Sequence, residues 1–490
     1  MGQSGTQTFR QKIKAVYRYE VVDTEKTPQI AGRRFHFIGA GGVGMSGLAK
    51  VMLKNKAIVT GSDQTRSIAT DKLCELGADI KTGHCAENLH SHTEAVVISA
   101  AVRESNPELI QARAKSCRVY KYAEMLGILC SRYETIAISG THGKSTTSGW
   151  LAYCLQLAGL DPNFIIGADV LQLGSSSGTG DSRFFVAEAC EYDRSFLNLK
   201  PYIGCILNIE ADHLDYYKDE AEIVEAFTDF ARGIKHGGVL IANGADANVA
   251  KVAKRLSSYV RLETFGFDKN YNYSAQNLVP ENSGYTFDVF RHGRLLGNTR
   301  ISLPGKHNVA NALAVIAMAK NAGMDTGRIL ELLPEFTGMD RRVMFKDKVN
   351  EITVLDDYAH HPTEIRASLQ AIRQKYEPKR LWCIFQPHQY SRTRFLLKDF
   401  AESFTLADVT IVPEIYFVRD SIDTKKEVNA QMLAEKIRGN GSEAIFIDGF
   451  DTICEYLTKN VQPGDVVVTM GAGDIWKVAD EYIQRLRGNR

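Results

Sequence analysis

A glycine-rich segment, "ISGTHGKSTT" at residues 138–147, has residue types and spacing that could bind the phosphates of a nucleotide. The usual phosphate loop reads G-x-x-x-x-G-K-[ST], and an isoleucine stands here where its first glycine is expected. Gly140 supplies a glycine two positions later, so the segment is a shortened loop. Its Lys144 is expected to reach the β- and γ-phosphates, and its Ser145 hydroxyl to ligate Mg²⁺. Because an accidental glycine turn rarely places Lys-Ser at a helix start after an apolar strand, we favour a phosphate site around Gly143.

Acidic residues follow two other apolar runs. Glu188 ends the run in "RFFVAEACEYD", and Asp212, His213 and Asp215 follow the run in "CILNIEADHLDYY". A lone Glu after a strand is usually only a helix cap. Two acidic strand ends beside a phosphate loop, however, predict a site for Mg²⁺, which prefers oxygen ligands.

A second glycine loop stands near the start of the chain, in "FHFIGAGGVGMSGLAK". Gly39, Gly41 and Gly44 form G-x-G-x-x-G between a strand and a helix, and Asp63 follows at the end of the next strand. This is the dinucleotide fingerprint, in which a helix N-terminus attracts a diphosphate. The same physics binds NAD or the diphosphate of a UDP-sugar, and a ligand-free glycine turn is the simplest alternative.

Two polar pairs in the last third of the chain have ordinary explanations. His360-His361 could be a fragment of a zinc site, but no third ligand stands nearby at a suitable spacing. Taken alone, the pair is better explained as a polar loop before a helix that starts at Pro362. Arg341-Arg342, taken alone, is a solvated linker pair.

Alternating apolar and amphipathic segments must position these residues. Apolar runs that read as buried strands cover 34–39, 57–63, 95–101, 135–140, 184–189, 203–209, 238–244, 352–358, 381–386, 408–414 and 465–471. Helix-like stretches such as 45–55 and 146–159 follow them, a pattern typical of parallel sheets with helices on both faces. Residues 265–303 alternate and carry turn signals, which predicts antiparallel hairpins. We therefore expect an α/β protein whose ligands sit at the carboxyl ends of strands.

The composition limits the class of protein. The 490 residues predict roughly three domains. A net charge of +1 gives no broad electrostatic footprint for nucleic acid or an anionic membrane. Nine scattered cysteines without C-x-x-C indicate free thiols in a reducing compartment, and no run is long enough to span a membrane. We expect a cytoplasmic protein with a flexible N-terminal extension.

Taken together, several motifs resemble the ATP-dependent Mur ligase family. They are "GAGGVGMSGLA", "GTHGKSTT", "EACEYD", "NIEADHLDYY", "PGKHNVANALA", "DDYAHHPTE" and "FQPHQYSRTR", and they extend the resemblance from about residue 33 to the C-terminus. The resemblance implies an extension at 1–31, a Rossmann-like UDP-sugar domain at 32–130, a central ATPase domain with a phosphate loop and a mixed sheet at 131–340, and a Rossmann-like domain at 341–490.

The resemblance also implies a reaction in peptidoglycan precursor synthesis. ATP would activate the lactyl carboxylate of UDP-N-acetylmuramate as an acyl phosphate, which the amine of L-alanine attacks, with Mg²⁺ or Mn²⁺ as the metal. A monomer or weak homodimer is expected. One alternative is a relative that recycles muropeptides or adds another amino acid. An NAD-dependent dehydrogenase is less favoured, because it leaves the phosphate loop, Glu188 and His213 unexplained.

The family match implies a role for individual residues. The catalytic set is Lys144, His213, Arg341, Arg342, His360 and His388. The ATP-binding set is Gly140, Thr141, His142, Gly143, Lys144, Ser145, Thr146, His307, Asn308, Asn311, Asp356 and Asp357. The UDP-sugar set is Gly39, Ala40, Gly41, Gly42, Val43, Gly44, Met45, Ser46, Asp63, Ser99 and Arg392. The amino-acid site is Tyr358, His360 and His388, and the metal ligands are Ser145, Glu188 and His213. Either member of Arg341-Arg342 could meet the phosphate, either member of Asp356-Asp357 could contact the ribose, and the role of the His142 side chain within the loop stays open.

Overall fold

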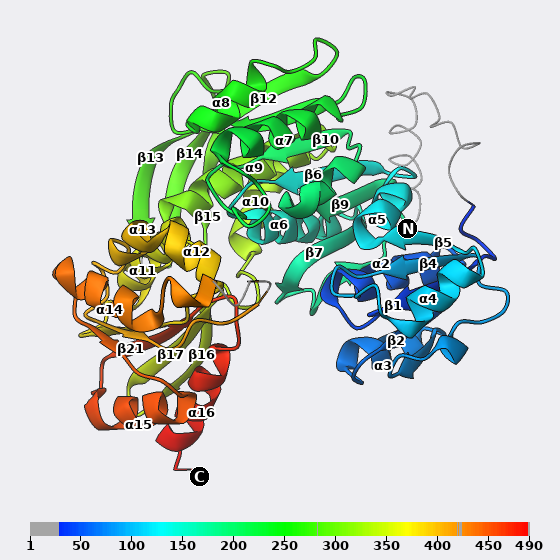
Figure 1. The fold of residues 1–490 in the computed structure, drawn as a ribbon. Helices are drawn as coiled ribbons and strands as arrows, with labels where there is room; N and C mark the ends of the chain where they lie inside the picture. Colours follow the sequence, from blue (N-terminus) through cyan, green and yellow to red (C-terminus); the bar gives the residue numbers. More distant parts are fainter. Residues whose placement is uncertain (1–28, 282, 419, 421–423, 489–490) are drawn as a thin grey trace, which may run out of the picture.

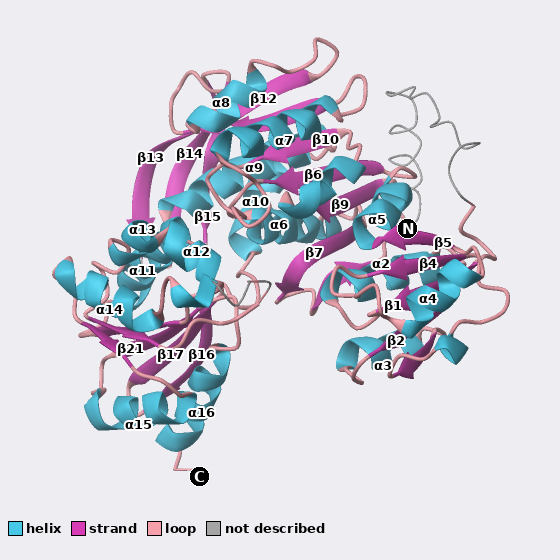
Figure 2. Cartoon of the chain, viewed as in Figure 1, coloured by secondary structure: helices cyan, strands magenta, loops and turns pink. Residues whose placement is uncertain are grey.

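The computed structural model describes residues 29–281, 283–418, 420 and 424–488, and it contains three sheets that follow one another along the chain (Figure 1). Most of the expected N-terminal extension, residues 1–28, lies outside the described residues. Figure 2 shows helices packed against the faces of each sheet, which is the α/β arrangement expected from the sequence.

The N-terminal sheet is fully parallel, with the order β3-β2-β1-β4-β5. Its strands are β1 (Arg34–Ile38), β2 (Ile58–Asp63), β3 (Asp79–Thr82), β4 (Ala95–Ile98) and β5 (Arg118–Lys121). Its helices are α2 (Val43–Lys54), α3 (Ile68–Glu75), η2 (Ala86–Asn88), α4 (Pro107–Ala114) and α5 (Tyr122–Cys130). The glycine loop connects β1 to α2, so it lies at the carboxyl end of the central strand, where this class of sheet binds ligands.

The central sheet is mixed, with the order β15-β14-β13-β12-β11-β10-β6-β9-β7-β8. Its strands are β6 (Glu134–Ser139), β7 (Asn163–Val170), β8 (Ser175–Gly178), β9 (Phe184–Glu188), β10 (Ile203–Ile206), β11 (Val239–Asn243), β12 (Arg261–Gly266), β13 (Tyr273–Glu281), β14 (Gly284–Arg291) and β15 (Arg294–Ile301). Strands β13 to β15 pair antiparallel, as predicted for residues 265–303. The helices are α6 (Lys144–Leu157), η3 (Tyr192–Asn198), α7 (Glu220–Arg232), α8 (Ala247–Ala253), α9 (Lys306–Asn321), α10 (Thr326–Leu332) and η4 (Leu333–Glu335).

The two faces of the central sheet are covered by different helices. Ile136 and Ile138 of β6 belong to the apolar core that contains α6 and α9, whereas Ala137 belongs to the core that contains α7. The second core also includes residues of α2 and α5, because helix α2 packs on β7 and β8. The N-terminal and central parts are therefore joined through apolar side chains.

The C-terminal sheet has the order β16-β17-β21-β18-β19-β20, with only β16 antiparallel to its neighbour. Its strands are β16 (Met344–Val349), β17 (Ile352–Asp357), β18 (Leu381–Phe385), β19 (Val409–Val412), β20 (Ala444–Phe446) and β21 (Val466–Met470). The helices are α11 (Pro362–Tyr376), α12 (Tyr390–Phe395), α13 (Leu397–Ala401), η5 (Thr424–Lys426), α14 (Ala430–Gly439), α15 (Phe450–Asn460) and α16 (Trp476–Leu486). Across the described ranges, no helix is both long and apolar enough to cross a membrane.

Candidate active site

The phosphate loop runs from the end of β6 to the start of α6, and its two glycines cannot be replaced without strain. Gly140 has φ 140° and Gly143 has φ 83°, values that L side chains rarely adopt. A Cβ on Gly140 would lie 3.0 Å from Leu207 Cβ, and one on Gly143 would lie 3.1 Å from Asn311 Oδ1. The glycines therefore let the loop backbone pass close to Leu207 and Asn311, and the loop leads into the N-terminus of α6, where an anion is favoured.

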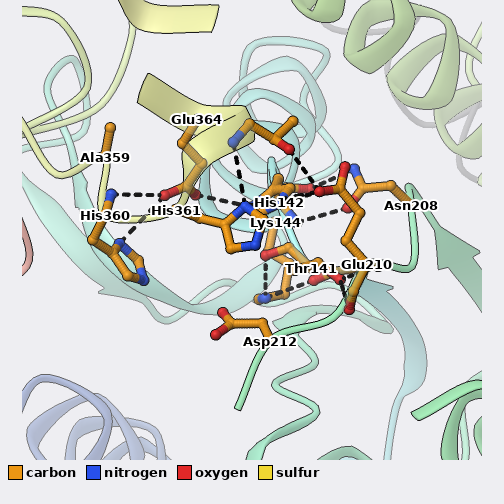
Figure 3. A network of polar contacts seen from close by, with 12 residues as sticks. Thr141, His142, Lys144, Asn208, Glu210, Asp212, Ala359, His360, His361 and Glu364 are labelled. Atoms are coloured by element: carbon orange, nitrogen blue, oxygen red, sulfur yellow. Dashed lines mark hydrogen bonds and ion pairs between the residues drawn. The ribbon is translucent and has the colours of Figure 1, made fainter. Parts of the chain in front are cut away.

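Lys144 points back over this loop (Figure 3). Its Nζ donates to the carbonyl of Gly140 at 2.6 Å and to that of Thr141 at 3.0 Å. It also pairs with Glu191 Oε2 at 3.0 Å, with 14% of the Lys144 side chain exposed. Burial alone would lower the pKa of Lys144, but Glu191 and its neighbours outweigh burial and raise it. Lys144 therefore remains charged before any nucleotide arrives.

Glu191 is a site residue that the sequence analysis missed. Its carboxylate lies between Lys144 and His213, whose Nε2 is 3.8 Å from Glu191 Oε1, and the hydroxyl of Tyr217 donates to its backbone carbonyl at 2.5 Å. Only 3% of its side chain is exposed. The signal was present, because Glu191 stands three residues after Glu188 in the same segment that follows a strand.

The residues expected to bind the metal belong to this neighbourhood. Glu188 ends β9, accepts a hydrogen bond from the Gly167 N–H at 2.8 Å, and contributes to the charge around Lys144. Ser145 is buried in the first turn of α6. Nearby, the buried carboxylate of Glu191 is paired with Lys144. Hydroxyl and carboxylate oxygens are the ligands that Mg²⁺ prefers, so the donor set fits this ion.

A cavity lies beside the phosphate loop, between the central and C-terminal sheets. Its lining contains these residues from the predicted ATP-binding and catalytic sets: His142, Gly143, Thr146, His307, Asn308, Asn311, Arg342 and Asp357. Burial lowers the pKa of His307 to about 4, so its ring is neutral at pH 7. The side-chain amide of Asn308 donates to the carbonyl of Pro304 at 2.7 Å and accepts from Asn311 at 3.1 Å. Elements far apart in sequence thus build one wall of the cavity.

The sequence analysis did not choose between the members of Arg341-Arg342 or of Asp356-Asp357, and in the structure the two members of each pair have different surroundings. Arg341 Nε donates to Asp356 Oδ2 at 2.8 Å, and neither residue lines the cavity, whereas Arg342 and Asp357 both do. The Asp357 carboxylate accepts the backbone N–H groups of Val343 and Ala359, both at 2.6 Å. Burial raises the pKa of Asp357 to about 6. Of each pair, the structure thus places only Arg342 and Asp357 in the lining of this cavity.

The remaining predicted residues of the C-terminal part gather around Asp212. Arg392 donates to Asp212 Oδ1 from Nε at 3.1 Å and from Nη2 at 2.8 Å, and both side chains are 7% exposed. The rings of His360 and His388 lie 6.3 Å apart, and burial lowers the pKa of His360 to about 4. The Nδ1 of His360 also lies 3.0 Å from the carbonyl of Tyr358. Arg392, assigned to the UDP-sugar from the resemblance, is here bonded to the central part.

His142, whose side chain had no specific role in the sequence analysis, lies at the boundary between the central and C-terminal parts (Figure 3). Its backbone N–H donates to Asn208 Oδ1 at 2.7 Å, while its ring nitrogens lie 3.2 Å from Glu364 Oε1 and 3.5 Å from Glu210 Oε2. The ring of His361 lies 4.6 Å away, centroid to centroid.

His142, Glu210 and His361 each offer one possible metal-ligand atom, all within 4.8 Å of one another. The sequence analysis found no third ligand for a histidine pair, and the fold supplies candidates from distant segments. Both ring nitrogens of His361 are already engaged, however: Nε2 lies 3.3 Å from the carbonyl of Ala211, and Nδ1 accepts the N–H of Thr363 at 3.3 Å. The cluster is therefore a network of hydrogen bonds and ion pairs.

The N-terminal glycine loop forms a separate site. The Gly41 N–H donates to Asp63 Oδ2 at 2.8 Å, so the acidic residue of the fingerprint holds the loop. A Cβ on Gly39 would lie 2.8 Å from Ser99 Oγ, which places the predicted Ser99 against the turn. The rest of the predicted set forms the turn and the first residues of α2, namely Ala40, Gly42, Val43, Gly44, Met45 and Ser46. None of these residues lines the cavity beside the phosphate loop.

In comparisons with known proteins, three family models match successive parts of the chain, one for each of the three sheets. Residues 34–134 match the model "Mur ligase family, catalytic domain", residues 138–319 match "Mur ligase middle domain", and residues 341–473 match "Mur ligase, glutamate ligase domain". The chain is 41% identical over 455 residues to a UDP-N-acetylmuramate–L-alanine ligase of Acetivibrio thermocellus, covering 92% of this chain and 96% of the relative. It is 42% identical over 454 residues to the same ligase of Clostridium tetani, covering 92% and 98%.

Solved structures are similar as well. The UDP-N-acetylmuramate-alanine ligase MurC of Thermotoga maritima superposes with a TM-score of 0.77 at 28% identity, covering 93% of this chain and 100% of that one. A murein peptide ligase of Psychrobacter arcticus superposes with a TM-score of 0.68 at 26% identity, covering 93% and 99%.

Proposed function

The chain belongs to the Mur ligase family, and we propose that it joins L-alanine to UDP-N-acetylmuramate with the hydrolysis of ATP to ADP and phosphate, in peptidoglycan precursor synthesis. One structural observation carries this proposal: a phosphate loop with a charged, buried Lys144 opens beside a cavity that the C-terminal sheet completes. That arrangement can hold a nucleotide between two parts of the chain while a carboxylate is activated. We propose domain boundaries near residues 130 and 340.

The charges around Lys144 suit the first step. The lactyl carboxylate of the sugar attacks the γ-phosphorus of ATP, and the bond from that phosphorus to the ADP oxygen breaks. Negative charge accumulates on the transferring group, and catalysis of phosphoryl transfer consists largely of positioning and neutralising it. Lys144 supplies one positive charge from the loop, and Arg342 supplies another from the cavity wall.

The second step forms the amide bond. The amine of L-alanine attacks the acyl carbon of the acyl phosphate, the amine loses a proton, and phosphate leaves. We assign the amino acid to the neighbourhood of Tyr358, His360 and His388. Burial lowers the pKa of His360 to about 4, so its ring is neutral and adds no positive charge beside the amine, but it is a weak base.

Ser145 and Glu188 would hold a divalent ion, Mg²⁺ or Mn²⁺, beside ATP, and His213 would hold or orient a second one near the acyl phosphate. When bound, such an ion neutralises phosphate charge and orients the polyphosphate. The chain's own residues prepare the place, since Glu191 keeps Lys144 and His213 beside the loop.

The UDP-sugar would bind at the glycine loop of Gly39–Ser46, held by Asp63 and Ser99. A diphosphate suits the N-terminus of α2, where backbone N–H groups lack partners within the helix. Its lactyl group would then extend towards the phosphate loop, because α2 packs directly on strands β7 and β8 of the central sheet. We propose that the protein works in the cytoplasm as a monomer or weak homodimer.

Phosphate release from ATP tests this function. We expect release to require both UDP-N-acetylmuramate and L-alanine, and UDP-N-acetylmuramoyl-L-alanine to form in equal amount. A murein tripeptide in place of L-alanine provides the comparison with the recycling relatives. Release that ignores both substrates, or faster turnover with the tripeptide, would contradict the proposal.

A further inference from the structure

Four charged side chains form an alternating row across the boundary between the central and C-terminal parts. Glu210 follows β10, His142 belongs to the phosphate loop, and Glu364 is in the first turn of α11. Arg342 ends the row, with its Nη1 3.7 Å from Glu364 Oε1. The same Glu364 oxygen lies 3.2 Å from His142 Nδ1, so the phosphate loop and the arginine share one acceptor atom.

The middle of the row is enclosed, whereas the side chains of Glu210 and Arg342 at its ends are 36% and 28% exposed. The side chains of His142 and Glu364 are each 12% exposed. Glu210 Oε2 also accepts the hydroxyl of Thr363 of α11 at 2.6 Å, and Glu364 Oε2 accepts the His360 N–H at 3.1 Å. Burial opposes a charge on His142, but the two carboxylates outweigh burial and raise its pKa to about 9. The ring is therefore an imidazolium between two carboxylates that different parts of the chain contribute.

We propose that His142 is a positioning residue whose imidazolium, shared between Glu210 and Glu364, ties the phosphate loop to the C-terminal part and thereby orients Arg342 into the nucleotide cavity. His142 reaches Glu364 of α11 only when the two parts are docked, so the attraction between these two largely enclosed charges favours the docked arrangement over a separated one. The kinetic consequence of this proposal rests on the proposed function, whereas its structural consequence does not.

The structural test uses the full chain without nucleotide. In small-angle X-ray scattering, we expect His142→Asn and Glu364→Gln each to shift the radius of gyration to a larger value than wild type. His236→Asn is the matched control, because His236 is exposed and stacks only on Tyr259 among the described residues. Circular dichroism must show that all variants are folded. An unchanged radius in both His142→Asn and Glu364→Gln would overturn the proposal, whatever reaction the protein catalyses.

The kinetic test separates positioning from simple nucleotide binding. We expect His142→Asn to lower kcat about 10-fold, because Arg342 is then less well positioned. The KM for ATP should rise less, because the backbone N–H groups that would bind the phosphates remain in place. The double variant His142→Asn/Glu364→Gln should lose less than the product of the two single losses, because the contact between His142 and Glu364 can be lost only once. Losses that simply multiply, or a loss confined to KM, would overturn the proposal. A chelator that enlarges the radius of the wild-type protein would also overturn it, since a metal would then hold the cluster.

Discussion

The charged side chain of Lys144 is only 14% exposed, so truncating it should have a measurable effect on catalysis. We expect Lys144→Ala to lower kcat for alanine-dependent phosphate release by about 1000-fold, because one positive charge near the transferring group is lost. Lys251→Ala is the control, since that lysine is exposed on α8 and its Nζ donates to Asn248 at 2.8 Å. Activity of Lys144→Ala close to that of the control would remove the phosphate-loop assignment.

Glu191 compensates Lys144 while no nucleotide is bound. Glu191→Gln leaves that lysine uncompensated, so we expect the unfolding free energy to fall by about 3 kcal/mol. Nucleotide phosphates restore the missing negative charge, so the increase in Tm on adding ATP should be larger in the variant than in wild type. Thermal denaturation with and without ATP measures both quantities. A Tm in the absence of ATP that equals the wild-type value would contradict this prediction.

Single residues were predictable where a local pattern defines them. The loop residues around Lys144, the post-strand Glu188 and the fingerprint Asp63 all follow an apolar strand at a recognisable spacing. Glu210 also follows an apolar run, but nothing local shows that it and Glu364 meet His142, because these contacts join long stretches of chain. Such meetings depend on how the sheets pack, which local spacing does not encode.

At the scale of elements, the strands that the sequence analysis identified as apolar runs are all inner ones, whereas the predicted hairpins at 265–303 extend to the edge strand β15. All eleven apolar runs form strands, from β1 to β21. The unpredicted strands β3, β5, β8, β16 and β20 lie at the edges of their sheets, and β7 and β12 are the interior exceptions. An edge strand needs little apolar surface, and segments such as "DIKT" and "RVYK" therefore lack the pattern of buried strands.

Helix α6 shows how tightly an element that carries the site is packed. A Cβ on Gly149 in this helix would lie 2.4 Å from Met339 Sδ. We expect Gly149→Ala to lower the unfolding free energy by about 1–3 kcal/mol through overpacking, despite the better helix propensity of alanine. Gly439→Ala in α14, where nothing lies within 4 Å, should be neutral or stabilising by about 0.5 kcal/mol. Denaturant unfolding compares the two, and equal effects would contradict the packing argument.

The whole molecule has two internal boundaries of different character (Figure 1). The boundary between the N-terminal and central sheets shares an apolar core, which favours a fixed arrangement. The boundary between the central and C-terminal sheets includes His142–Glu364, Thr363–Glu210 and Arg392–Asp212. Polar contacts of this kind can be exchanged for water, so opening is expected at the second boundary, beside the nucleotide cavity.

The second boundary should respond to pH through His142. Its neighbours in the cluster are Glu210, Glu364, His361, Arg342 and His307. The pKa of Glu210 is lowered to about 2 and that of Glu364 is also lowered, so both stay ionised above pH 6.5. Burial lowers the pKa values of His361 and His307, which remain neutral there, and arginine stays charged. His142 is thus the cluster residue that changes charge between pH 6.5 and about 9.

Because the docked arrangement raises the pKa of His142 from 6.5 to about 9, docking binds this proton more tightly than separation does. The stabilisation of the docked arrangement is therefore fully present below pH 6.5 and is lost as pH rises through about 9. We expect the radius of gyration of the wild-type protein to grow over this interval and that of His142→Asn to stay at its larger value throughout. Identical pH profiles for the two proteins would show that another group controls the boundary, and a radius that shrinks with rising pH would contradict the sign of the linkage.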